Sequence, residues 1–321
     1  MNSRLIFLAF LVAMLTIGWI GSCVMWRAAE VGELVQPLKP RHFETLSVIA
    51  IGTGGPYENP ERLGPSIAVG WGDHVLLVDA GRGVAEALRK AQIAVAQPEV
   101  VLLTNLLPHN ILGLDDLLFT GWLESRSAPL RLIGPPGTAE FAEGIRAAYR
   151  AGRAAQQDGL ALPREGGTFE VMEVEGGWSQ ELDGLRISAG DLPGGPTPAL
   201  AWKIEHSGRS VVVSGTGWAD DALVSFASGA NMLIHEAVYI PPPEDIEAAG
   251  VIADPERLRM EAALHTSILD VGSLAARAKV ETLVLVRMRP PPFFEIQVTN
   301  IVGRDFDGEI VVPDDGAELS P

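Results

Sequence analysis

The side chains best suited to chemistry lie in four short segments of the chain. They are Asn105, His109 and Asn110, then Asp191, then His235 with Glu236, and finally His265. Imidazole nitrogens and carboxylate oxygens exchange protons near neutral pH and also bind divalent metal ions. These residue types therefore indicate either acid–base catalysis or a metal site, provided that the fold brings the four segments together.

The segment 104–116 lies between an expected strand and an expected helix. Val100–Leu103 is an apolar, β-branched run typical of a buried strand, and Leu112–Leu123 has the apolar spacing of a helix. Asp115 and Asp116 open that helix, where they favour the positive end of its dipole. His109 is either a ligand or base, or a loop histidine bonded to the backbone.

The remaining elements follow from periodicity and turn signals. Expected strands are 46–51, 66–70, 75–78, 199–204, 210–213, 232–234 and 283–286, and expected helices are 83–91, 138–157 and 271–278. Thr138 is the expected N-cap of its helix. This order is compatible with two sheets packed face to face and covered by helices.

Composition limits the class of protein. The chain has 321 residues, 47% hydrophobic content and a mean hydropathy of +0.20, which allows one large core. Its net charge of −17 disfavours nucleic-acid binding, because that needs basic patches. We expect one domain over residues 45–312, after a linker at 28–44 and before an acidic tail at 313–321.

Residues 1–27 read as a membrane anchor or a signal segment. No charged residue occurs from Leu5 to Trp26, a run long enough to cross a bilayer. The segment that ends at Cys23 is similar to a bacterial lipobox, so Cys23 is either a lipidation site or a cysteine within a membrane helix. The expected location is a membrane-anchored domain in the periplasm or outside the cell.

Eight segments resemble the metallo-β-lactamase superfamily, in the branch that includes ribonuclease Z and similar small hydrolases. They are Gly52–Pro56, Leu76–Gly81, Thr104–Asp116, Gly134–Thr138, Ser214–Thr216, Leu233–Ala237, Leu264–Ser267 and Leu283–Arg287. Their order and spacing carry the resemblance across nearly all of residues 45–312. It implies an αββα sandwich, here preceded by the N-terminal membrane helix or signal segment.

The resemblance also implies two zinc ions, held by histidines and carboxylates, that activate a water molecule. The matching positions in this chain are Asn105, Leu107, His109, Asn110, Gly194, Thr216 and Arg287. Leu107 has no lone pair, and the guanidinium of Arg287 is always charged and cannot bind a metal. The sequence therefore predicts a degenerate site without the two zinc ions and with no cofactor.

The leading interpretation is a non-catalytic pseudoenzyme tethered to a membrane, which binds an unknown small molecule or protein and no nucleic acid. The alternative is an ester or phosphodiester hydrolase with a mononuclear or metal-free site that uses His109 and His265. A tRNA-processing enzyme is disfavoured by the acidic composition, the N-terminal segment and the missing ligands.

Other polar residues would line the remaining cleft. Through the resemblance, His265 matches a histidine that assists proton transfer, although a structural hydrogen bond is the plainer interpretation. If Arg287 points into the centre, it needs a carboxylate partner, for which Asp191 and Glu236 are the hypotheses. His235 and Glu236 complete the predicted polar cleft.

Overall fold

The computed structural model describes residues 3–57, 59–193, 197–217, 220–239, 254, 256, 260, 264–289 and 295–321. It divides into two compact units, Met1–Leu38 and Lys39–Pro321. The first unit contains helix α1, Ser3–Val35. Within it, Phe10–Ala29 is long and apolar enough to cross a membrane by length and composition alone. Cys23 is exposed on this helix and forms no disulfide.

The predicted linker at 28–44 overlaps both flanking elements. Helix α1 continues to Val35, and strand β1 already begins at Phe43. Helix α1 ends two residues before Pro37, and a proline cannot continue a helix because it lacks a backbone N–H. The non-helical connection is therefore shorter than expected.

The second unit is built on two sheets of seven strands each. The first sheet, in the order β14-β1-β2-β3-β4-β5-β6, contains β1 (Phe43–Gly52), β2 (Ser66–Gly72), β3 (His74–Val78), β4 (Pro98–Leu102), β5 (Leu130–Gly134), β6 (Phe169–Glu173) and β14 (Ala317–Leu319). The second, in the order β13-β12-β11-β10-β9-β8-β7, contains β7 (Ser179–Leu182), β8 (Leu185–Asp191), β9 (Leu200–His206), β10 (Arg209–Val213), β11 (Met232–Val238), β12 (Thr282–Arg289) and β13 (Glu309–Val311).

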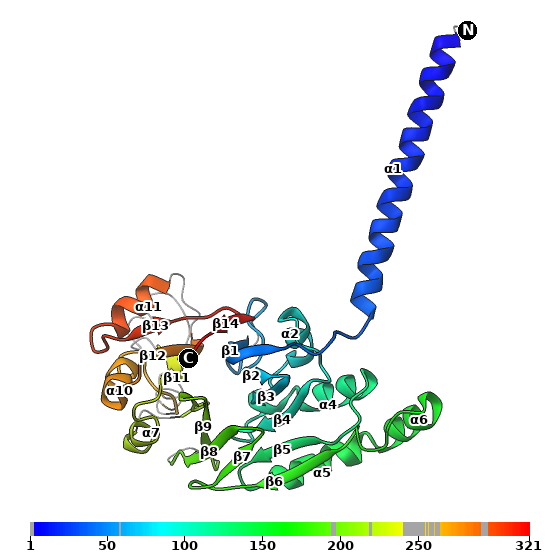
Figure 1. Cartoon of the computed structure of the whole chain (residues 1–321). Helices are drawn as coiled ribbons and strands as arrows, with labels where there is room; N and C mark the ends of the chain where they lie inside the picture. Colours follow the sequence, from blue (N-terminus) through cyan, green and yellow to red (C-terminus); the bar gives the residue numbers. More distant parts are fainter. Residues whose placement is uncertain are drawn as a thin grey trace. The chain divides into compact units, whose positions relative to one another are not determined.

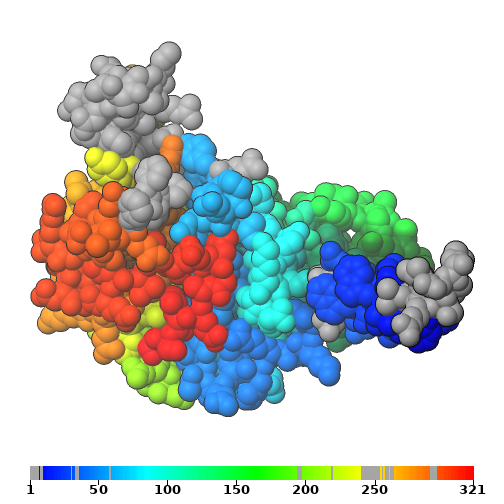
Figure 2. All heavy atoms as spheres, turned by 90° about the horizontal axis from the view of Figure 1, so that it is seen from above, coloured from blue at the N-terminus to red at the C-terminus, as the bar shows by residue number. Residues whose placement is uncertain are grey.

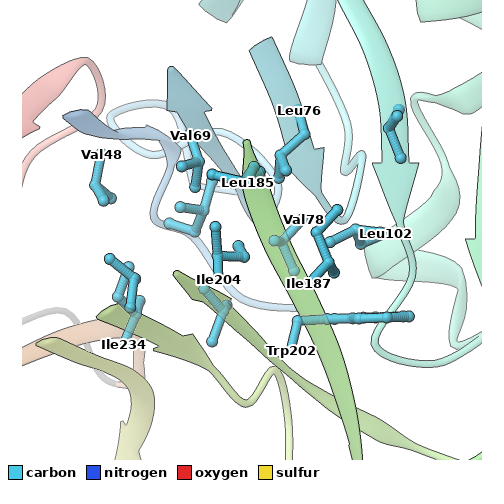
Figure 3. Packing of buried hydrophobic residues seen from close by; sticks show 14 of the residues in the cluster. Val48, Val69, Leu76, Val78, Leu102, Leu185, Ile187, Trp202, Ile204 and Ile234 are labelled. Atoms are coloured by element: carbon cyan, nitrogen blue, oxygen red, sulfur yellow. The ribbon is translucent and has the colours of Figure 1, made fainter. Parts of the chain in front are cut away.

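Helices cover the outer face of each sheet, which gives the predicted αββα order of layers (Figure 1). On the first sheet lie α2 (Val84–Lys90), α4 (Leu114–Leu123) and α5 (Thr138–Ala148), and on the second lie α7 (Asp221–Phe226), α10 (Val271–Ala278) and α11 (Glu295–Val302). Between the sheets, Val69 and Leu76 of one face Ile187 and Ile204 of the other (Figure 3). Apolar residues on alternate strand positions thus fill the central layer.

The carboxyl ends of several strands meet at one edge of the sandwich. Strands β3 to β6 run parallel in the first sheet, and β10 to β13 run parallel in the second. Here the sheets are joined directly: Leu200 N–H donates to the carbonyl of Thr104 at 2.7 Å, and Arg287 N–H donates to that of Thr53 at 2.7 Å. Segments that follow the two groups of strands are therefore neighbours.

The expected strands and the helices at 83–91, 112–123 and 271–278 are confirmed, apart from shifts of their ends. The expected helix at 138–157 is divided at Tyr149 into α5 and α6 (Arg150–Leu160). Thr138 is the first residue of α5 and not its cap. The carboxylate of Glu173 accepts bonds from the N–H groups of Gly137 and Ala139, each at 2.9 Å, and so fills that role from β6.

The predicted acidic tail at 313–321 contains strand β14, which pairs antiparallel with β1. In Figure 2 the red C-terminal residues lie against the blue residues of the first strands. One carboxylate, that of Asp315, accepts from Thr53 N–H and Thr53 Oγ1, each at 2.8 Å, and from Leu63 N–H at 2.5 Å. The acidic residues therefore hold the chain end in place.

We predict that Asp315→Ala lowers the free energy of unfolding by about 2 kcal/mol, because two backbone N–H groups and one hydroxyl lose a charged acceptor. Asp314→Ala is the matched control, since the side chain of Asp314 is 86% exposed and, among the described residues, bonds only to Arg62. Urea unfolding of both variants, followed by tryptophan fluorescence, measures the difference. An equal loss of unfolding free energy in the two variants would contradict the role of Asp315 as the acceptor that holds the chain end.

Candidate active site

A buried ion pair between Asp79 and Arg287 lies at the shared edge of the two sheets. Arg287 Nη2 donates to Asp79 Oδ2 at 2.6 Å, and the side chains are 5% and 0% exposed. Asp79 directly follows β3, and Arg287 lies within β12. The predicted carboxylate partners, Asp191 and Glu236, are wrong: Asp191 accepts from Gly176 N–H at 2.7 Å, and Glu236 faces His265.

Both members of the pair have left-handed backbones, with φ of +60° at Asp79 and +54° at Arg287. Such conformations cost about 1–3 kcal/mol each for residues other than glycine. The surrounding bonds offset this strain. Thr104 donates to Asp79 through its N–H at 2.8 Å and through Oγ1 at 2.8 Å. Gly215 packs here with φ of +69°, where a Cβ would lie 2.5 Å from Thr104 Oγ1, so the two loops meet only with glycine.

Two asparagines extend the network from Arg287. Its Nη2 donates to Asn110 Oδ1 at 3.2 Å, and Asn110 Nδ2 donates to Asn105 Oδ1 at 2.7 Å. The same Asn105 oxygen accepts from Leu107 N–H at 2.9 Å. Side-chain amides and Nη2 of Arg287 thus bond to one another at positions where the resemblance implies metal ligands, while Arg287 Nε has no hydrogen-bond partner among the described residues.

His109 is the half-buried histidine of this edge. Its Nε2 lies 3.4 Å from Thr216 Oγ1, and this contact joins the loop after β4 to the loop after β10. Burial lowers the pKa of His109 to about 4, and the positive charge of Arg287 and the nearby His265 act in the same direction. His109 is therefore neutral at pH 7 and has a ring nitrogen able to accept a proton.

A second histidine is held by a buried carboxylate. His265 Nδ1 lies 3.0 Å from Glu236 Oε2, and Glu236 is 1% exposed. Glu236 Oε1 also accepts from the N–H groups of Gly217 at 3.1 Å and Thr266 at 3.3 Å. Nδ1 of His265 is thus fixed, and Nε2 has no hydrogen bond among the described residues.

His235 is a structural histidine, fully buried between two hydroxyls. Thr266 Oγ1 donates to the carbonyl of Gly217 at 2.6 Å, so it accepts from His235 Nε2 at 2.7 Å, and Nδ1 accepts from Ser214. Burial lowers the pKa of His235 to about 4. This neutral ring ties the ends of β10 and β11 to the segment before α10.

The positions predicted by resemblance do not fit two metal ions. Leu107 offers no ligand atom, Asn105 and Asn110 are bonded to each other, and Arg287 brings a permanent positive charge. Thr216 contributes a neutral hydroxyl, a poor bridge between two cations. Gly194 lies outside the described residues.

The structure brings most of the predicted site residues together and adds several that the sequence did not single out. Asn105, His109, Asn110, Thr216 and Arg287 form one group, and His235, Glu236 and His265 form the adjoining one. The missed residues are Asp79, Thr104 and Thr266. For Asp79 a signal existed, because it is a charged residue directly after the apolar strand 75–78.

The fold and this arrangement agree with comparisons to known proteins. No family model matches the chain. Among solved structures, the metallo-β-lactamase fold protein YhfI from Bacillus subtilis is similar with a TM-score of 0.67 and 17% identity, covering 86% of this chain and 100% of that one. The short form of human tRNase Z is similar with a TM-score of 0.63 and 19% identity, covering 85% and 98%.

Zn²⁺-bound PqqB from Methylobacterium extorquens has a TM-score of 0.57 and 19% identity, covering 86% of this chain and 100% of that one. These likenesses define a protein of the metallo-β-lactamase fold. Ribonuclease Z from Mycobacterium bovis is 33% identical over 279 residues, covering 84% of this chain and 96% of that protein. The chain belongs to the ribonuclease Z family of the metallo-β-lactamase superfamily.

Family membership corrects four predictions. The expected pseudoenzyme, and with it a chain that is not an active hydrolase, is contradicted by relatives named as ribonucleases. The expected absence of a nucleic-acid partner is contradicted by the same names. The expectation of no cofactor is contradicted by a zinc-bound neighbour, and His74, Glu99 and Asp183 are a described group able to hold a metal ion.

We predict that Arg287→Met lowers the free energy of unfolding by about 3–5 kcal/mol, since Asp79 then stays buried without its countercharge. Adding Asp79→Asn should restore part of this loss, because an amide needs no cation. Denaturant unfolding of the two single variants and the double variant measures the coupling. An Arg287→Met protein as stable as the original would contradict a buried ion pair.

The neutral His235 predicts acid sensitivity. Its pKa is lowered from 6.5 to about 4, so the folded state binds fewer protons than the unfolded state between these values. The contribution of neutral His235 to the free energy of unfolding is fully present above pH 6.5. It decreases by roughly 3 kcal/mol as the pH falls to 4. His235→Gln should flatten the pH dependence of unfolding, whereas His206→Gln, at an exposed histidine on β9, should leave it unchanged.

Proposed function

We propose that this chain is a hydrolase that cleaves a phosphodiester bond in RNA. Two histidines, His109 and His265, lie at the edge where the loops of both sheets meet, with Arg287 close enough to influence the first. Support comes from the names of its relatives, ribonuclease Z and tRNase Z. The observation that carries the proposal is the neutral, half-buried His109 beside a cation.

His109 acts as the proton acceptor. Its lowered pKa keeps the ring neutral at neutral pH, so that Nε2 is free of a proton in the tautomer protonated on Nδ1, and the hydroxyl of Thr216 already approaches Nε2 at 3.4 Å. A water molecule or a ribose hydroxyl in a similar position would transfer its proton to Nε2 as it attacks phosphorus. The alkoxide or hydroxide is thus produced only as the new P–O bond forms.

His265 acts as the proton donor. Glu236 holds Nδ1 and orients the ring, in the way that a buried carboxylate orients the histidine of a catalytic triad. Nε2 then delivers a proton to the leaving oxygen as the old P–O bond breaks. One proton is taken up and one is released, so both histidines return to their starting states after exchange with solvent.

Arg287 supports the reaction through its charge. It adds to the effect of burial, which is the larger cause, in lowering the pKa of His109. Arg82 and Arg289 follow Asp79 and Arg287 closely in the chain and therefore lie near the same edge. These arginines provide local positive charge despite the net charge of −17.

No step of this mechanism passes through a metal ion in the cleft, because the positions for two ions carry Leu107, Asn110, Thr216 and Arg287. Zinc would supply an activated water in the related proteins. Here the neutral imidazole of His109 generates the nucleophile.

We also propose that α1 anchors the chain in a membrane, supported by the uncharged run from Leu5 to Trp26. A periplasmic or extracellular domain, and lipidation of Cys23, remain predictions. Fusions of alkaline phosphatase and of green fluorescent protein to the C-terminus distinguish the two sides. Active phosphatase would support the periplasmic side, and fluorescence alone would contradict it.

We predict that His109→Ala and His265→Ala each lower kcat for cleavage of a 3′-extended tRNA precursor by about 10²–10⁴-fold, the usual contribution of an acid–base group. His206→Ala is the matched control, because His206 lies at the β9–β10 turn and bonds only to the Gly184 carbonyl among the described residues. Gel analysis of the products also shows which hydroxyl attacked: water leaves a 5′ or 3′ phosphate, whereas a ribose hydroxyl leaves a cyclic phosphate.

A folded protein that cleaves neither RNA nor a simple phosphodiester would contradict the proposal. Equal activity in all three variants would place the chemistry elsewhere in the chain.

A further inference from the structure

A second cluster of ligating side chains lies at the end of the sandwich opposite the cleft. His74 begins β3 and Glu99 is the second residue of β4, so both stand at the starts of strands whose ends form the cleft. Asp183 belongs to the turn between β7 and β8 of the other sheet. One ligand atom from each residue lies within 4.8 Å of the other two.

The backbone departs from regular geometry at two of these three positions. Between β3 and β4 the pairing passes from Val75 with Pro98 to Leu76 with Val100, which leaves Glu99 as an extra residue. Such a bulge redirects a side chain relative to its strand. Asp183 has a φ of +48° and, with Gly184 at +79°, forms the two-residue turn of the β7–β8 hairpin, where such a conformation is expected. Glu99 thus contacts His74, and the turn brings Asp183 within reach of both.

Trp71 fixes the other parts of the cluster. Its indole ring, 4% exposed, stacks on the ring of His74 at 5.2 Å between centroids. Its Nε1 donates to the carbonyl of Asp183 at 3.2 Å, which holds the β7–β8 turn against the first sheet. His74 Nδ1 lies 3.1 Å from Glu99 Oε1. The imidazole and one carboxylate are therefore oriented before any ligand arrives.

We propose that His74, Glu99 and Asp183 bind one zinc ion that clamps the two sheets together. An imidazole nitrogen and two carboxylate oxygens are normal zinc ligands, at about 2.0–2.2 Å from the ion. Around a tetrahedral ion these bond lengths put ligand atoms about 3.3–3.6 Å apart, so the half-exposed Glu99 and the exposed Asp183 must rotate to bring the three atoms, now within 4.8 Å of one another, closer together. The ion replaces the proton between His74 and Glu99, which leaves to solvent, and its two positive charges balance the carboxylates of Glu99 and Asp183.

This site is independent of the cleft, and its zinc takes no part in the cleavage. The full chain in detergent, stripped with a chelator and dialysed against Zn²⁺, should retain about one equivalent by elemental mass spectrometry. Its melting temperature should rise with added Zn²⁺, because the ion binds only the folded state. The His74→Ala protein should bind no equivalent of zinc, and its melting temperature should not rise with added Zn²⁺.

His42→Ala is the matched control, since His42 is also a surface histidine paired with a carboxylate, Asp73, at 2.7 Å. It should keep the zinc and the rise in melting temperature. Glu99→Gln and Asp183→Asn test the ligands with minimal change of shape, should His74→Ala unfold. Both should weaken zinc binding at least tenfold.

Two results would overturn the proposal: no zinc on the original chain, or zinc retained in His74→Ala and Asp183→Asn alike. Zinc that disappears instead in a His109→Ala/His265→Ala double variant would place the ion in the cleft. RNA cleavage by the His74→Ala protein separates the two ideas, because it should continue if the clamp is structural.

Discussion

The ion pair between Asp79 and Arg287 is the interaction on which the active-site edge depends. A guanidinium and a carboxylate this deeply buried are tolerated only when each bonds to the other and neighbouring polar groups add further bonds. Thr104 donates to Asp79, and Asn110 accepts from Arg287. Because Asp79 follows β3 and Arg287 lies in β12, the pair also joins the two sheets at the point where their loops meet.

Burial and the neighbouring cation act together on His109. Burial is the larger cause that lowers the pKa of His109, and the positive charge of Arg287 adds to it, whereas Glu236 holds His265 through an acceptor. The two imidazoles thus have different environments, which is the arrangement that separates a base from an acid.

The two ends of the sandwich hold different groups of polar side chains. At one end, strand carboxyl termini gather polar loops, and buried networks of threonine, asparagine and histidine hold them. At the other end, Trp71 locks a hairpin of one sheet to a turn of the other and aligns a histidine with two carboxylates. The family's association with zinc and the absence of a fitting ligand set in the cleft are then compatible, because the ligands for one ion lie elsewhere.

The sequence by itself determined the order of the layers, most strands and the family, since these depend on local periodicity and on residue types in short segments. It misjudged function, because missing ligands were taken to mean missing activity. Only the tertiary structure decided that Arg287 pairs with a residue 208 positions away, that 317–319 form a strand on β1, and that His265 faces Glu236. Such contacts depend on how two sheets pack, and no local pattern records which of several carboxylates a buried cation will reach.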